Sequence, residues 1–273
     1  MKFKYYGTAA YEGFPAIFCA CDACKRARKA GGRNIRSRSQ ALIDNTLLID
    51  FPADTAMRYL YDDLPLPDIH HCLITHKHSD HFYPKDVVAR CPVYAYPETE
   101  EALHFYLPAN CAPELEQLLS EQPHGDRVKL HIIKPFDVFQ IADKYTITVL
   151  PAHHSADAVF FMIDDGVDTI LYAHDTGDFR EEVWDYLAKE KPRFSFVTYD
   201  CTYGIQDNGS HHMGFPVVRR MNDKLRELGC VDDKTVLYVN HFSHNGKVTY
   251  DEMVPIAAEY GYEVAYDGCV LDI

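Results

Sequence analysis

Short apolar or alternating stretches recur along the chain, separated by polar turns. They predict β-strands at 2–6, 40–43, 46–50, 70–75, 93–96, 129–133, 145–150, 159–163, 169–173, 194–199, 236–240 and 263–266. Apolar residues at helical spacing predict a helix over 216–228 that Gly229 ends. Thr249 and Glu252 form a capping-box pattern that opens a second helix over 249–260. Strands alternating with helices predict an α/β protein, but periodicity does not choose among α/β folds.

One strand end concentrates residues that bind metals. His76, His78, Asp80 and His81 follow the apolar run 72–74 within six positions. Alternate side chains of a strand share a face, so the first two imidazoles enter one space, and the following turn can direct the other two groups there. Nitrogen donors with a carboxylate suit zinc, manganese or iron better than calcium or magnesium. A His-rich surface turn is the alternative interpretation.

A second cluster, a zinc knuckle at 19–24, carries three thiols. Cys19, Cys21 and Cys24 have C-x-C-x-x-C spacing, one ligand short of a closed tetrahedral zinc site, and His244 is the expected fourth ligand. A disulfide or a redox thiol pair is the alternative. The odd count of nine cysteines and the lack of an N-terminal apolar signal stretch argue for a reducing cytoplasm.

The motif H-x-H-x-D-H resembles the signature of the metallo-β-lactamase fold, a superfamily of mostly dinuclear metallohydrolases. The resemblance implies one α/β domain over 1–273, an αββα sandwich of two mixed sheets flanked by helices. It also implies further ligands after later strands. The implied ligands of two divalent ions are His76, His78 and His154 on one, Asp80, His81 and His241 on the other, and Asp175 between them.

Other residues matched by the resemblance are expected to support these ligands. Asp50 and His153 are expected to orient them through hydrogen bonds from behind. His153 is also the alternative ligand to His154, because both follow the same strand. The donor set leaves zinc, manganese and iron open as the two active-site ions, beside one structural zinc in the knuckle.

The knuckle cysteines and His244, combined with H-x-H-x-D-H, resemble the phosphoribosyl 1,2-cyclic phosphate phosphodiesterase branch of this superfamily. This resemblance implies hydrolysis of a small, cyclic or linear, nucleotide or sugar phosphate by a water shared between the two ions. It implies catalytic roles for Asp80 at the metals and for His212 as proton donor to the leaving group. His211 is the alternative donor. The segment 199–204 departs from the branch, so the substrate is not fixed.

Composition limits the kinds of molecule that the chain is expected to bind. The net charge is −14, from 27 basic and 41 acidic residues, which opposes binding of a nucleic acid polymer and favours a small phosphate ester. No apolar run is long enough for a membrane span. A homodimer stays open. A thioester or lactone hydrolase is the alternative enzyme, and a metal-dependent sensor is the non-enzymatic one.

The segment 97–123 is less regular and contains four prolines. It predicts two short helices, at 98–107 and 113–121. Because it follows the metal-binding loop, it is interpreted as a helical insertion that covers the site like a lid, or as a peripheral insertion.

Overall fold

The computed structural model describes residues 1–96 and 98–273; Pro97, where the predicted insertion begins, lies outside the described residues. The chain forms two seven-stranded sheets. In spatial order the first sheet consists of β14 (Val270–Asp272), β1 (Lys2–Gly7), β2 (Gln40–Ile43), β3 (Leu47–Ile49), β4 (His71–Leu73), β5 (Leu103–Pro108) and β6 (Val128–Ile133). The second consists of β13 (Glu263–Val264), β12 (Val236–Asn240), β11 (Phe196–Asp200), β10 (Thr169–Ala173), β9 (Val159–Asp164), β8 (Tyr145–Pro151) and β7 (Val138–Ile141).

Both sheets are mixed in the same way. In the first, β14 to β3 pair antiparallel and β3 to β6 pair parallel. In the second, β7 to β10 pair antiparallel and β10 to β13 pair parallel. The parallel strands β10 and β11 are buried along their whole length, as expected for strands covered on both faces.

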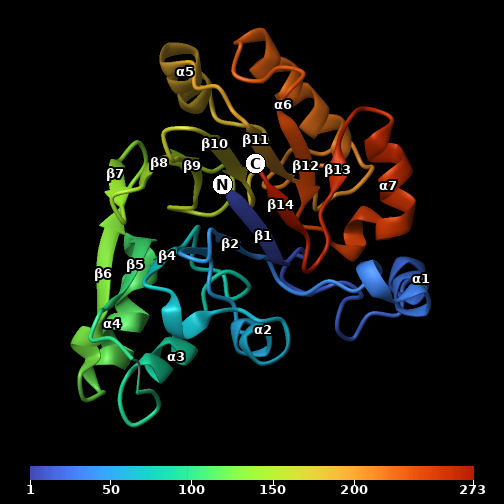
Figure 1. Ribbon diagram of the computed structural model, residues 1–273. Helices are drawn as coiled ribbons and strands as arrows, with labels where there is room; N and C mark the ends of the chain where they lie inside the picture. The colour runs from blue at the N-terminus through green and yellow to red at the C-terminus, as the bar shows by residue number, and fades with distance from the viewer. Residues whose placement is uncertain (97) are drawn as a thin grey trace.

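Helices cover the outer faces of both sheets (Figure 1). The helices are α1 (Asp22–Ala30), α2 (Thr55–Tyr61), α3 (Pro84–Val87), α4 (Ala112–Ser120), α5 (Glu181–Glu190), α6 (Phe215–Glu227) and α7 (Tyr250–Ala258). One apolar core lies between the sheets, and two others fill the spaces under α3 and α4 and under α5 to α7. The predicted αββα sandwich of two mixed sheets is confirmed.

Two predictions in the middle of the chain are wrong. Residues 93–96 form no strand, since 92–94 are a turn, and 103–107, expected within a helix, belong to strand β5. Leu103, Phe105 and Leu107 alternate with less buried residues, and β5 pairs in parallel with β4 and β6. Pairing with two strands outweighed the local helical preference of the preceding acidic residues. The second predicted helix is confirmed as α4.

The other differences lie at the sheet edges. Strands β7 and β14 were not predicted, because β7 has only four residues, β14 has only three, and both are half exposed. The helices predicted over 216–228 and 249–260 are confirmed as α6 and α7, and α7 has the complete capping box of Thr249 and Glu252. Their apolar faces complete the core on the outside of the second sheet.

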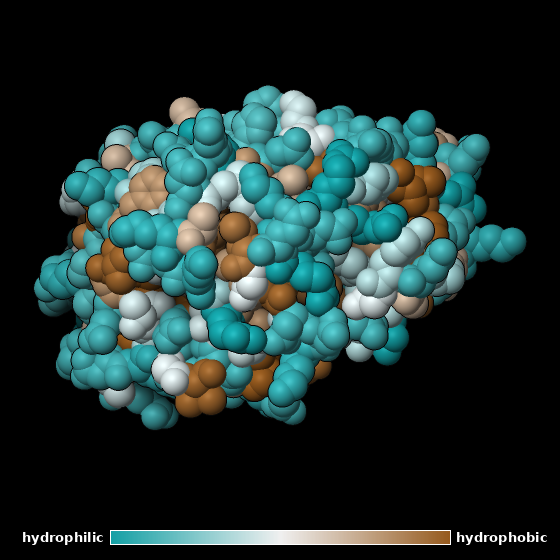
Figure 2. Space-filling model, turned by 90° about the horizontal axis from the view of Figure 1, so that it is seen from above, coloured by the Kyte–Doolittle hydropathy of each residue, from teal (hydrophilic) through white to brown (hydrophobic). Residues whose placement is uncertain are grey.

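One face of the surface shows how polar and apolar residues are distributed. Seen from above, most of it is hydrophilic, and hydrophobic residues are scattered in small groups (Figure 2). No helix in the described ranges is both long and apolar enough to cross a membrane.

Candidate metal centre

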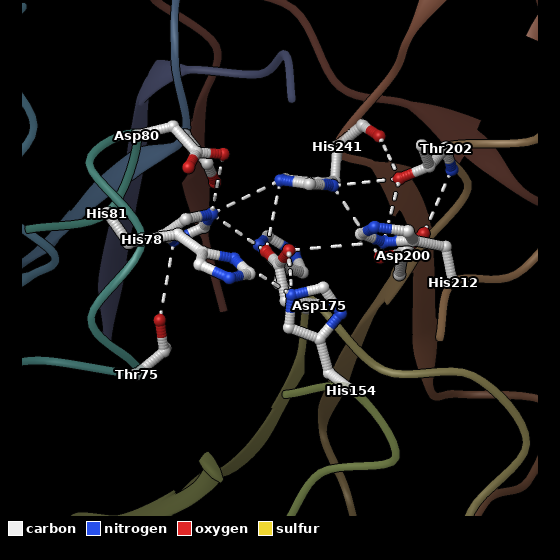
Figure 3. A network of polar contacts seen from close by, with 12 residues as sticks. Thr75, His78, Asp80, His81, His154, Asp175, Asp200, Thr202, His212 and His241 are labelled. Atoms are coloured by element: carbon white, nitrogen blue, oxygen red, sulfur yellow. Dashed lines mark hydrogen bonds and ion pairs between the residues drawn. The ribbon is translucent and has the colours of Figure 1, made fainter. Parts of the chain in front are cut away.

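The carboxyl ends of strands from both sheets supply a cluster of imidazoles and carboxylates. The loop after β4 brings His76, His78, Asp80 and His81, and strands β8, β10 and β12 are followed by one candidate ligand each, His154, Asp175 and His241. Strand ends are fixed by their neighbours in the sheet, so groups placed there hold their positions before any metal binds. Figure 3 shows the labelled His78, His81, His154 and His241 grouped around Asp175.

The cluster divides into two groups of donor atoms. His78 Nδ1 lies 2.9 Å from His76 Nε2 and 3.2 Å from His154 Nε2. On the other side, His81 Nε2 lies 3.3 Å from both His241 Nε2 and an oxygen of Asp80. These are the two ligand groups that the resemblance implies.

Asp175 lies between the two groups with one oxygen toward each. Its Oδ1 is 3.6 Å from His154 Nε2, whereas its Oδ2 is 2.9 Å from His81 Nε2 and 3.0 Å from His241 Nε2. The buried Oδ2 makes no hydrogen bond of acceptable geometry despite these short distances. A carboxylate with one oxygen toward each donor group fits a ligand shared by two cations.

Hydrogen bonds from behind fix the orientation of the imidazole rings. His154 Nδ1 lies 3.1 Å from the carbonyl oxygen of His211, and His81 Nδ1 lies 2.6 Å from Asp50 Oδ2. His241 Nδ1 lies 2.8 Å from Thr202 Oγ1. Each contact accounts for the outer nitrogen and leaves Nε2 for the cluster, which is how proteins select the metal-binding tautomer.

Asp50 is the deepest of these supports. It is fully buried and accepts from the backbone N–H and the hydroxyl of Thr75 as well as facing His81. Thr75 Oγ1 also lies 3.1 Å from His76 Nδ1. Asp50 thus connects the end of β3 to the metal-binding loop, in the position expected of it.

The geometry separates His153 from His154. His154 enters the cluster, whereas the His153 ring lies with its Nδ1 3.1 Å from the carbonyl oxygen of Asp178. The backbone of His153 accepts from the Gly177 N–H, and its own N–H donates to Thr176. His153 therefore braces the loop that carries Asp175 through both its backbone and its imidazole, and its ring stays outside the ligand cluster.

Electrostatics shows that the cluster is suited to a cation. Burial alone would raise the pKa of Asp175, but the His241 and His81 rings hold it well below its usual range. Burial alone would lower the pKa of His81, but Asp175, Asp50 and Asp80 raise it well above its usual range. Carboxylates that stabilise a positive charge so strongly also favour metal ions, which displace protons from such ligands. The residues present fit the divalent ions that the fold implies.

A second buried acid holds His212 at the edge of the cluster. Asp200, which ends β11, lies with Oδ2 2.8 Å from His212 Nδ1. Burial would lower the pKa of His212, but Asp200 raises it to about 9. His212 Nδ1 is 3.9 Å from Asp175 Oδ1, so the ring lies beside the ligands. His211 instead points its Nδ1 at the carbonyl oxygen of His154.

The cysteines of the knuckle meet His244 at a separate site. His244 Nδ1 lies 3.3 Å from the sulfur of Cys19 and 3.6 Å from that of Cys21, and Cys24 belongs to the same group of donors. The backbone N–H of Cys24 donates to the sulfur of Cys21, which lowers the Cys21 pKa to about 6. Four soft donors with this arrangement fit a closed tetrahedral zinc site.

A pocket of about 470 Å³ opens over the cluster. Besides the candidate ligands and His212, its walls come from Ala10, Tyr11, Glu12, Ser79, Thr202, Tyr203, Ser243 and Asn245. None of these wall residues belongs to 98–123, the described part of the segment expected to act as a lid. The wall comes from the loops after β1, β4, β11 and β12, since most of that segment is used by β5 and α4.

Sequence reasoning missed two residues of the site. Asp200 and Thr202 hold His212 and His241 through hydrogen bonds. The pattern that marks Asp50 was also present here, because Asp200 ends a buried strand and is followed by a turn. Without a His beside it, that acid gave no local sign of chemistry.

Comparison with protein families identifies the fold family. A model described as "Beta-lactamase superfamily domain" matches residues 46–266, which include every candidate ligand of the cluster. The chain belongs to the β-lactamase superfamily. It is a hydrolase of the metallo-β-lactamase fold, a fold that implies divalent metal ions.

Two curated proteins of the superfamily are similar in sequence. The 5′ exonuclease Apollo of Gallus gallus is 30% identical over 146 residues, which cover 52% of this chain and 26% of that protein. Ribonuclease Z of Picosynechococcus sp. is 28% identical over 205 residues, covering 71% of this chain and 60% of that protein. The chain thus matches about a quarter and three fifths of these relatives' lengths.

Solved structures of this superfamily share the fold over the full chain. A diphosphatase of the PhnP family superposes with a TM-score of 0.73 at 17% identity, covering 100% of this chain and 97% of that one. Zinc-bound PqqB from Methylobacterium extorquens gives a TM-score of 0.72 at 16% identity over 100% of both chains. Human tRNase Z, short form, gives 0.66 at 15% identity, covering 100% and 99%.

Proposed function

We propose that this chain is a dinuclear metal-dependent phosphodiesterase that hydrolyses small phosphate esters, among them cyclic or linear nucleotide or sugar phosphates. The observation that carries the proposal is the pair of His212 and Asp200 beside the ligand cluster. The names of the similar proteins, an exonuclease, a ribonuclease and a diphosphatase, agree with phosphoester chemistry.

The candidate ligands would hold two metal ions in separate groups. His76, His78 and His154 would hold one divalent ion, Asp80, His81 and His241 the other, and Asp175 would bridge them. Bound there, two such ions would activate a water and neutralise charge on the phosphoryl oxygens. The hydrogen bonds behind the ligands keep the donor atoms aimed at the pocket floor, so no side chain must reorient when the substrate arrives.

His212 supplies the proton that the leaving group needs. Its Nδ1 faces Asp200, and the ring lines the pocket, so its other nitrogen is available to the substrate. The pKa of about 9 in the metal-free chain keeps the ring protonated at neutral pH. Positive charge nearby lowers this pKa toward the neutral range in which a general acid acts best.

This arrangement favours an alkoxide leaving group over a thiolate. An alkoxide must be protonated as it departs, whereas a thiolate leaves without help at neutral pH because its thiol is more acidic. A buried Asp–His pair held beside the ligands therefore supports phosphodiester hydrolysis over thioester hydrolysis, the alternative for this fold.

The test combines leaving groups with a matched pair of variants. Metal-loaded wild type, His212→Asn and His211→Asn are assayed on a 2′,3′-cyclic nucleotide, on bis-p-nitrophenyl phosphate and on a thioester. We expect His212→Asn to lose about 10²–10⁴-fold of cyclic nucleotide turnover, but much less with p-nitrophenolate, which needs no proton. His211→Asn should stay close to wild type, since Asn tolerates the left-handed backbone there.

Faster turnover of the thioester than of either phosphodiester by the wild type would refute the proposal. Equal losses for the two phosphodiesters in His212→Asn would remove the proton-donor role but keep the enzyme class. Metal content measured on each variant shows whether a loss has another cause.

A further inference from the structure

The pocket over the ligand cluster has walls of uncharged and acidic side chains. Away from the candidate ligands and His212 they consist of two phenols, a carboxylate, an amide, hydroxyls and one alanine. No lysine or arginine lies among the described residues that line it. Arg38, which donates to the carbonyl oxygen of Tyr11 near the rim, is paired with Asp54 at 2.9 Å.

The aromatic rings stand where a leaving group would lie. Tyr203 packs edge to face against His212, with ring centroids 6.0 Å apart and planes at 80°. Tyr11 forms part of the wall and is 57% exposed. A flat base or sugar ring that accepts the His212 proton would therefore pack against Tyr203 as it leaves.

Glu12 gives this wall a negative charge. Its Oε1 accepts from the hydroxyl of Ser243 and lies 3.5 Å from His244 Nε2, so the carboxylate is held in place rather than free to swing away. The exposed Asn245 lines the same wall, and its backbone N–H donates to Ser243. Such a wall accepts hydrogen bonds from hydroxyls and repels a second phosphate.

We infer that this pocket selects phosphodiesters whose leaving group is a neutral, hydroxyl-bearing ring, that Tyr203 packs against this ring, and that Glu12 excludes substrates with an additional phosphate group. The inference rests on the proposed phosphodiesterase function and names its substrate class. An additional phosphate group would bring two negative charges into the pocket. Among the described lining residues no cationic side chain could neutralise them, and the bound ions would already be engaged by the scissile phosphate.

The experiment compares two substrates that differ only in charge. Adenosine 2′,3′-cyclic phosphate and the same compound with a 5′-phosphate are offered to metal-loaded wild type, Glu12→Gln, Tyr203→Ala and the control Glu227→Gln, an exposed residue of α6. We expect wild type to favour the first substrate by at least about tenfold in kcat/KM. Glu12→Gln should reduce this preference several-fold, and Glu227→Gln should leave it unchanged.

Tyr203→Ala separates packing from charge. It should lower kcat/KM for both cyclic nucleotides by roughly tenfold, because base stacking is lost, and keep their ratio. A Tyr203→Phe protein should recover most of this loss. The zinc content of Glu12→Gln is measured, because Glu12 also contacts His244.

A wild type that cleaves the 5′-phosphorylated substrate equally well or better would overturn the inference, as would a ratio that Glu12→Gln does not change while its zinc is retained. Failure to cleave any phosphodiester would instead refute the proposed function. Calorimetry then still decides the selectivity, because the pocket should bind adenosine monophosphate more tightly than adenosine diphosphate, and Glu12→Gln should narrow that difference.

Discussion

The ligand cluster and the cysteine knuckle are both candidate metal sites, but they are built in opposite ways. The cluster gathers buried groups from strand ends of two sheets, and further hydrogen bonds hold its rings. The knuckle takes three of its four donors from 19–24, and Cys21 is exposed. The fold alone shapes the cluster, whereas in the knuckle a bound metal would tie a short loop to His244.

Removing the bridge should have the largest effect. In Asp175→Ala both donor groups lose their shared carboxylate, so we expect loss of at least one active-site ion and of about 10³-fold or more in turnover. Metal analysis with steady-state kinetics checks this. The neighbouring acid Asp178 provides the control, since it contributes only backbone contacts to the site, and Asp178→Asn should keep its metals.

Weakening the support behind the cluster should have the next largest effect. Asp50→Asn keeps the shape but removes the charge that faces His81, and such outer partners typically contribute 10- to 100-fold in metal affinity. Competition with a chelator measures the change. If Asp50→Asn retained wild-type metal affinity, the cluster would not depend on its outer hydrogen bonds and the contrast with the knuckle would fail.

Opening the knuckle should affect stability more than chemistry. Cys21→Ser is expected to lose the knuckle zinc and about 1–3 kcal/mol of unfolding free energy, with a change in turnover below about tenfold. Denaturant unfolding and zinc analysis test this. Cys230→Ala changes a buried thiol of a different apolar core, so this variant should keep the knuckle zinc. Undiminished stability and zinc content in Cys21→Ser would remove the zinc assignment.

The smallest expected effect is on stability, at a charged contact outside both sites. Asp44 accepts from Lys144 and Tyr145; burial would raise its pKa, but these partners lower it. Because the folded pKa is lowered, this stabilisation is present above about pH 4 and is lost as pH falls through the folded value. Asp44→Asn should cost about 0.5–1 kcal/mol at neutral pH, a difference that vanishes in acid. Unfolding measured from pH 3 to 7 checks the sign.

Local spacing made the first four candidate ligands visible in the sequence, and the family resemblance implied the other three. The loop after β4 carries four candidate ligands within six residues, and His154, Asp175 and His241 each follow a buried strand. Such patterns survive folding because a strand end fixes where the next side chains point. The capping box of α7 could be read from two residues for the same reason.

Long-range contacts could not be inferred in this way. Strand β14 exists because it pairs with β1 at the far end of the chain, and β5 because two parallel neighbours accept it. Asp200 acquires its role only when α6 and β12 bring His212 and His241 beside it. These features depend on partners distant in sequence, which no local pattern encodes.

The link between the two sites is the segment from His241 to His244. Phe242 exchanges backbone hydrogen bonds with Thr8 and Ala10, so this segment is locked to the loop that carries the pocket wall. One short stretch of backbone thus sets the reach of a ligand in each centre. A single residue inserted between these histidines would move one ligand relative to the other, so the two centres together fix the length of this segment.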